Sequence, residues 1–154
     1  MSTIKRTYHA VDIENILALT HGMTIGLQAG ELYKAIVGFG PGDLIEVAAD
    51  VTRVFQARAA FPGAKVLHGV GRDGADRALI ASIDLDHIAG RFDGITIASG
   101  DHAFVDLAYR ARRRGLEVIV VSRPSCLSRV LAPYADIVID MPEFDTTPEF
   151  IVAA

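Results

Sequence analysis

Short apolar runs that alternate with helical segments constrain the fold of this chain more than any other feature. Strands that are apolar on both faces and alternate with helices are typical of a parallel sheet that helices cover on both sides. We therefore predict an α/β fold, a three-layer α/β/α sandwich with a mainly parallel sheet. The expected strands cover residues 8–12, 44–49, 65–70, 94–99, 117–122 and 136–141.

The segments between these strands have the apolar spacing and the end signals of helices. The run from Gly38 to Gly42 ends a helix that begins at Met23. Thr52 is the expected N-cap of the next helix, and Gly115 is the expected stop of a later one. The predicted helices cover residues 23–37, 53–60, 75–89, 102–114 and 125–134.

Length and composition predict a single domain. The chain has 154 residues, of which 51% are hydrophobic, enough for one core over about 8–141, followed by a tail at 142–154. No apolar run reaches the roughly 18 residues of a membrane span, and the first residues lack the pattern of a signal peptide. Cys126 is the only cysteine, so an internal disulfide is excluded and a cytoplasmic location is expected.

The net charge argues against a general coat for nucleic acid. It is -4, whereas proteins that bind nucleic acid over a broad surface are usually basic. If this chain binds nucleic acid, it does so through a local basic patch or through metal ions.

Aspartates stand at three junctions between a predicted strand and a helix. Asp12 ends the first strand, Asp101 follows the fourth, and Asp76 lies in the first turn of the helix after the third. In an open parallel sheet such ends share the edge where ligands bind. Carboxylates that meet there repel one another unless a cation is bound, and hard oxygen ligands suit Mg²⁺ or Mn²⁺. We predict a metal site, although each aspartate also has the position of an ordinary helix cap.

Polar neighbours of these aspartates complete the predicted site. Asn15, one turn beyond Asp12, is expected either to orient that carboxylate or a water, or to cap a helix. Ser99 is expected to bind phosphate or to serve the turn before Asp101. Glu14 is a weaker candidate, because it is expected to point away from the face that Asp12 and Asn15 share.

Three segments in order resemble the NYN branch of the PIN-like nucleases. That family typically has an Asp-x-x-Asn opening, a Gly-x-Asp at a helix start and a Ser-Gly-Asp-x-Asp-Phe turn. The matching segments here are Asp12 to Asn15, Gly74 to Asp76 and Ser99 to Phe104, and the resemblance extends from about Tyr8 to Met141.

This resemblance implies a PIN-like, Rossmannoid fold with strand order 3-2-1-4-5 and a metal-dependent nuclease that most often acts on RNA. It implies that Asp12, Asp76 and Asp101 bind the metal and that Asn15 is their polar partner. One position departs from the pattern, because the second acid of the turn is Ala103 here. Asp106, three residues further on, is a weaker candidate to replace it.

Cations near the predicted strand ends are the expected contacts for substrate phosphates. Arg72, Arg77 and Arg123 each lie at a strand-end loop or a helix start, and His102 follows Asp101 directly. The basic run at 110–114 lies at the far end of its helix, where cations complement the helix dipole, and we expect it to be solvated.

The sequence therefore predicts a divalent-metal-dependent (endo)ribonuclease, with RNA favoured over DNA as the partner. A catalytically weak or inactive RNA-binding or scaffold module of the same fold is the main alternative. Gly69 to Gly74 also fits the G-x-G-x-x-G pattern of a dinucleotide site, and Asp12 with Glu14 resembles the Asp-x-Asp of haloacid-dehalogenase phosphatases. Homo-oligomerisation is left open.

Overall fold

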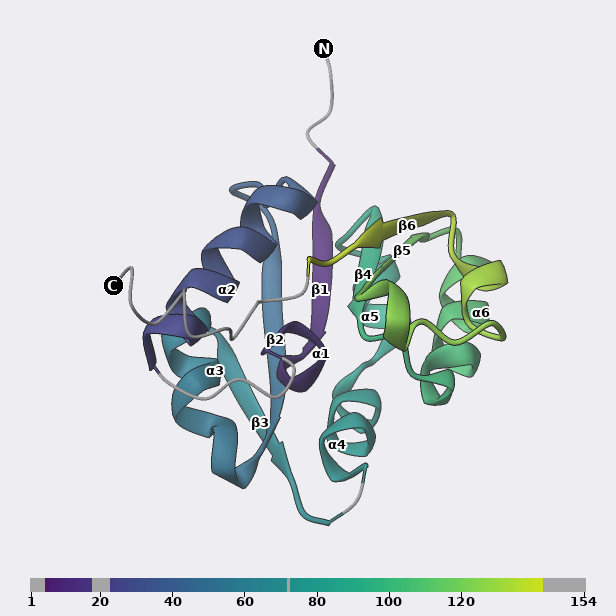
Figure 1. Cartoon of the computed structure of the whole chain (residues 1–154). Coiled ribbons are helices and arrows are strands. Elements are labelled where there is room, and N and C mark those ends of the chain that lie inside the picture. Colours follow the sequence, from purple (N-terminus) through teal and green to yellow (C-terminus); the bar gives the residue numbers. More distant parts are fainter. Residues whose placement is uncertain (1–4, 18–22, 72, 143–154) are drawn as a thin grey trace.

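The computed structural model describes residues 5–17, 23–71 and 73–142. Within them a single sheet of six parallel strands has the order β3-β2-β1-β4-β5-β6 (Figure 1). The order expected from the resemblance is confirmed, and β6 extends it at the edge beside β5. The strands are β1 (Thr7–Asp12), β2 (Leu44–Asp50), β3 (Lys65–Gly69), β4 (Gly94–Ala98), β5 (Glu117–Ser122) and β6 (Ile137–Asp140).

The centre of the sheet lies at β1, which pairs with β2 on one side and with β4 on the other. Tyr8 lies beside Leu44 and Ile95, so the three strands begin at the same edge and end at the same edge. The chain order reverses direction between β1 and β4. In open parallel sheets, ligands bind at the carboxyl ends of the strands beside such a switch point.

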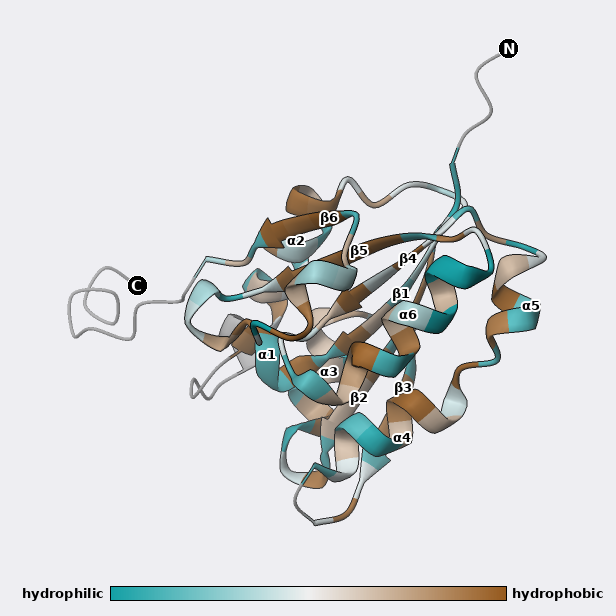
Figure 2. Cartoon of the chain, turned by 90° about the vertical axis from the view of Figure 1, so that its right-hand side faces the viewer, coloured by the Kyte–Doolittle hydropathy of each residue, from teal (hydrophilic) through white to brown (hydrophobic). Residues whose placement is uncertain are grey.

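Helices cover both faces of the sheet. Two separate apolar cores result, and the strands contribute alternate side chains to each. Figure 2 shows brown, apolar colour along much of the sheet, and both teal and brown residues on the helices around it. One face carries α1 (Ile13–Leu17), α2 (Met23–Val37) and α3 (Val54–Ala60), and the other carries α4 (Gly74–Ser82), α5 (Leu85–Ala89) and α6 (Val105–Arg113).

Three predicted helices differ from the structure for local reasons. The expected helix over 75–89 breaks after Ser82, because the Asp84 carboxylate accepts backbone hydrogen bonds that start α5. Asp50, rather than Thr52, caps the turn η1 (Val51–Arg53) before α3, and its carboxylate accepts from the Thr52 amide at 2.8 Å. The segment 125–134 contains only the short 3₁₀ turns η3 (Pro124–Cys126) and η4 (Ala132–Tyr134), each with a proline at its start.

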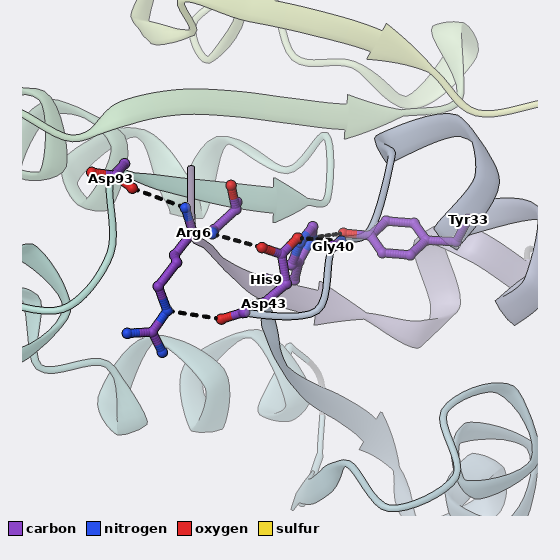
Figure 3. Close-up of polar contacts among 8 residues, drawn as sticks. Arg6, His9, Tyr33, Gly40, Asp43 and Asp93 are labelled. Carbon is purple, nitrogen blue, oxygen red and sulfur yellow. Dashed lines mark hydrogen bonds and ion pairs between the residues drawn. The ribbon is translucent and has the colours of Figure 1, made fainter. Parts of the chain in front are cut away.

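A buried polar network fastens the amino-terminal edge of the sheet, opposite the strand ends that carry the aspartates (Figure 3). His9 Nδ1 lies 2.8 Å from the Tyr33 hydroxyl, and His9 Nε2 lies 3.0 Å from the Asp43 carboxylate. The same carboxylate accepts the amides of Thr7 at 2.9 Å and Gly40 at 3.1 Å. The Asp43 carboxylate can only accept, so His9 donates to it from Nε2. The other ring nitrogen, Nδ1, then accepts the proton of the Tyr33 hydroxyl.

No helix in the described part of the chain has the length and apolarity that a bilayer crossing requires. The predicted tail beyond Pro142 lies outside the described residues.

Candidate metal centre

Asp12 is the last residue of β1, and it is nearly buried at the central strand end. It is 9% exposed and lies beside Ala48 of β2. Its Oδ1 accepts the amide of Glu14 at 3.2 Å, which turns the chain from the strand into α1. The carboxylate is therefore held in place by the backbone that follows it.

The loop before α4 brings acidic residues to the same edge. The backbones of Gly69 and Gly74 touch, since a Cβ on Gly69 would lie 1.9 Å from the Gly74 carbonyl carbon. Asp73 between them has a left-handed backbone with φ of 57°, and it precedes the first residue of α4. Only glycine permits the close approach of residues 69 and 74. This contact holds the first turn of α4, with the buried Asp76, against the edge of the sheet.

Asp101 reaches the site from the far side of β1, after Ser99 and Gly100, which follow the end of β4. Its Oδ1 accepts the Ala103 amide at 2.8 Å and caps the turn η2 (His102–Phe104). The Ser99 hydroxyl oxygen accepts the Asp101 amide at 3.2 Å, so Ser99 serves this turn. Gly100 allows the turn to lie against the next loop, because a Cβ there would be 2.3 Å from the Cys126 carbonyl oxygen.

Together these turns gather a cluster of carboxylates. Oxygens of Asp73, Asp76 and Asp101 all lie within 4.8 Å of one another. Asp12 lines the same hollow as Asp73 and Asp76, so all of the predicted acids share one edge. Sequence reasoning missed Asp73. The available signal was its place one residue before a helix-opening glycine and three residues before Asp76.

The electrostatics of the cluster are unfavourable without a counter-ion. Burial raises the pKa of Asp12 well above its ordinary value, and the Asp76 and Glu14 charges raise it further. Burial also raises the pKa of Asp76, and so do the Asp101, Asp73 and Glu14 charges, whereas the interaction with the neighbouring Asp12 carboxyl opposes this rise. Both pKa values rise because carboxylates crowded together at a buried edge disfavour one another's charged form.

The donor set fits a hard divalent cation. Asp76 Oδ1 is buried and has no hydrogen-bond partner in the described structure, and such orphaned acceptors need an explanation. Ligands on opposite sides of Mg²⁺ span about 4.2 Å, so carboxylates within 4.8 Å need only small movements to share one ion. Asp73 is exposed and Asp101 is partly exposed, which leaves room for that movement and for water ligands.

Two hollows open at this edge and meet at Asp12 and Glu14, which line both. The larger has a volume of about 380 Å³ and is also lined by Asp50, Asp73 and Asp76. The smaller has a volume of about 170 Å³, and its remaining lining residues are Asn15, Ser99, Gly100, Asp101, Arg123 and Cys126.

A comparison with known families agrees with this architecture. The sequence profile of the NYN domain matches residues 6–142, nearly the whole chain. The chain belongs to the NYN domain family. The family is nuclease-like and typically uses divalent metals, and the acidic cluster of this NYN domain offers the carboxylates that such an ion needs.

The fold of the NYN domain also occurs in a solved structure. It is similar to a crystal structure of a protein of unknown function from Vibrio parahaemolyticus RIMD 2210633. The TM-score is 0.63, with 20% identity over 92% of this chain and 97% of that chain. At this identity the likeness shows the fold alone. No match was found among curated proteins.

Asn15 of the NYN domain holds the ends of β1 and β5 together. Its Nδ2 donates to the Val121 carbonyl at 3.2 Å, and its backbone carbonyl accepts from Arg123 Nε at 3.0 Å. The Ser122 hydroxyl lies 3.5 Å from Asn15 Oδ1. The structure gives Asn15 a role in shaping the smaller hollow and in placing Arg123, in addition to its position beside Asp12.

The remaining predicted residues take different positions. Glu14 does not point away from the site, because it lines both hollows and raises the pKa of both buried aspartates. His102 is exposed, with Nδ1 3.4 Å from Asp101 Oδ1. Asp106 is exposed and pairs with Arg110 at 2.7 Å, outside the acidic cluster. Arg77 is exposed on α4, and Arg72 lies outside the described residues.

The glycine pattern at 69–74 has a structural explanation in the NYN domain. A dinucleotide fingerprint normally follows the first, central strand, where the switch point lies. Here the pattern follows β3, which is the edge strand. Its glycines serve the close contact between β3 and α4, and this favours the acidic cluster over the dinucleotide alternative.

Proposed function

We propose that this NYN domain is a divalent-metal-dependent nuclease that hydrolyses phosphodiester bonds, with RNA favoured over DNA as its substrate. The observation that carries the proposal is the orphaned, buried Asp76 oxygen, which lies among the carboxylates of Asp73 and Asp101 and in the same hollow as Asp12. Carboxylates in such a place destabilise the free protein and are retained where a cation or a reaction needs them.

Each residue at the edge has a role in the proposed reaction. Asp73, Asp76 and Asp101 would hold Mg²⁺ or Mn²⁺, which when bound polarises a phosphodiester and makes a water more acidic. Asp12, whose carboxyl is nearly buried, accepts the proton of the attacking water. Arg123 is fixed by its bond from Nε to Asn15, and its remaining guanidinium N–H groups orient a phosphate in the smaller hollow.

A second candidate function is RNA binding without hydrolysis. Ala103 stands where the family pattern has a second acid, and the nearby Asp106 is paired with Arg110 instead. A site with fewer acids next to the substrate would retain binding and lose rate.

The test is a cleavage assay with purified protein and labelled single-stranded RNA. We expect cleavage with Mn²⁺, none with chelator, and slower cleavage of DNA of the same sequence. Asp101→Asn is expected to lower the rate at least about 100-fold, as is common when a group that stabilises the transition state is removed. Asp86→Asn is the matched control, because Asp86 is exposed on α5 and pairs with Arg114.

Cleavage that persists in chelator, or that is unchanged in Asp101→Asn, would contradict the metal role. RNA that is bound but not cut with either metal would favour the second candidate.

A further inference from the structure

The three most exposed large apolar side chains in the described part of the chain follow the carboxyl ends of β2 and β3, the edge of the sheet that carries the acidic cluster. Val70 is 84% exposed, Phe55 70% and Val51 64%. They belong to the residue after β3, to α3 and to η1. Single exposed apolar residues are ordinary on protein surfaces, but a group of them beside a site marks an interaction surface. We name Val51, Phe55 and Val70 the apolar rim.

The strand register places the rim residues together. Asp50 of β2 pairs with Gly69 of β3, so Val51 and Val70 leave adjacent strand ends, which lie about 4.8 Å apart in a sheet. Phe55 follows Val51 by four residues across η1 and the start of α3, which places both on the same side of that segment. The rim is thus assembled from two parts of the chain.

The rim is continuous with the larger acidic hollow. Asp50 and Gly71 line that hollow, and they adjoin Val51 and Val70 in sequence. Asp73 and Asp76, two of the proposed metal ligands, also line this hollow, so a nucleotide that adjoins a metal-bound phosphate lies on the side of the site where the rim residues leave the sheet.

Charge decides which part of a nucleic acid suits the rim. Asp50, Asp73 and Glu14 surround this side of the hollow, and they repel phosphates that no cation screens. A nucleobase is uncharged and offers a flat face that stacks on an aromatic ring. Bases in a duplex are already stacked on one another, so the base that fits is an unpaired one.

We propose that Phe55, supported by Val51 and Val70, is a platform on which an unpaired base next to the bound phosphate stacks. The substrate is then single-stranded RNA at this position. This inference rests on the proposed function for its choice of occupant. It adds a substrate-binding residue that the motifs do not contain.

The test measures RNA binding separately from cleavage. In an Asp12→Asn background, which keeps the three carboxylates proposed to hold the metal, fluorescence anisotropy of a labelled single-stranded RNA in the presence of Mn²⁺ gives the Kd with and without Phe55→Ala. Because stacking on an aromatic residue contributes about 1–3 kcal/mol per base, we expect Phe55→Ala to raise Kd about 5- to 100-fold. Phe55→Tyr is expected to restore binding to within about 2-fold, since its ring stacks equally well.

Control measurements show whether the effect is specific to the stacking of an unpaired base. Leu44→Ala removes an exposed apolar side chain (49% exposed) at the opposite edge of the sheet, and it should leave Kd unchanged. A blunt RNA duplex of the same sequence should bind more weakly and should not respond to Phe55→Ala. A single 2-aminopurine base in the RNA should be quenched on binding, and the quenching should be lost in Phe55→Ala.

The outcomes distinguish this inference from the proposed function. If the wild type never cleaves RNA but Phe55→Ala weakens RNA binding, hydrolysis is refuted and the platform is supported. Equal Kd values with and without Phe55→Ala, or equal losses on single-stranded and duplex RNA, would overturn the platform. The platform would also be overturned if the wild type is a dimer and Phe55→Ala dissociates that dimer without changing RNA binding. Phe55 would then contact a second copy of the chain.

Discussion

We expect the Asp76→Asn variant to be more stable than the wild type without metal, and less stable than the wild type when metal is added. In the metal-free protein, Asp76 lies within 4.8 Å of two other carboxylates. Two unit charges at that distance repel by about 1 kcal/mol at the dielectric constant of water and by about 3.5 kcal/mol at an effective value of 20. Asp73 and Asp101 are both partly or fully exposed, which favours the lower part of this range.

We therefore expect Asp76→Asn to raise the unfolding free energy of the metal-free protein by about 1–3 kcal/mol. For a chain of this size, that change raises Tm by about 3–10 °C. With Mn²⁺ at 100 times its Kd, the wild type gains about 2.7 kcal/mol from ligand binding, whereas the variant gains much less. The wild type should then be the more stable of the two.

Thermal melting in chelator and in a Mn²⁺ series measures both effects. Asp86→Asn, which removes an exposed carboxylate that pairs with Arg114, should keep the metal response of the wild type. An Asp76→Asn protein that is less stable than the wild type in chelator would refute the reasoning, because it would mean that the negative charge stabilises the free protein.

Other predictions follow from single features of the structure. The raised pKa of Asp12 means that the folded metal-free protein keeps a proton that the unfolded chain releases. The unfolding free energy should therefore fall as pH rises above the usual Asp range. Asp12→Asn should weaken this pH dependence in urea titrations at several pH values. Burial lowers the pKa of His9 despite the Asp43 carboxylate, so stability should also fall as pH drops below about 6.5, and His9→Gln should remove that loss. Gly100→Ala should cost about 1–3 kcal/mol in urea unfolding and lower the metal-dependent Tm shift, because its Cβ has no space. Asn15→Ala should cost about 1–3 kcal/mol by the same assay, since it leaves a buried carbonyl unpaired.

Much of the fold was predictable because the strands are apolar on both faces. That pattern marks a parallel sheet wherever it alternates with helices, and the helix Met23–Val37 and the strand Glu117–Ser122 have the predicted bounds. The break between α4 and α5 was not predictable from periodicity, because Leu79, Ile83 and Leu85 continue an apolar pattern across it. The Asp84 cap, a local competitor of the helix, decides the break.

Some residues of the candidate site were predictable from the sequence and others were not. Asp12 ends a buried strand and Asp101 lies in the turn that follows another, so their meeting follows from topology once the sheet is known to be parallel. Asp73 was missed because its position depends on a left-handed residue and on the contact of Gly69 with Gly74, both of which are tertiary features. Glu14 was misplaced because α1 is too short for its face to be read from spacing.

Anomalous diffraction from crystals soaked in Mn²⁺ tests the central claim most directly, because it locates the ion without any assumption about substrate. The account predicts a strong peak at the carboxyl end of the sheet, within coordinating distance of Asp76 and at least one of Asp73 and Asp101, and its loss in Asp76→Asn crystals. A Mn²⁺ peak elsewhere on the molecule, with none between these carboxylates, would contradict it.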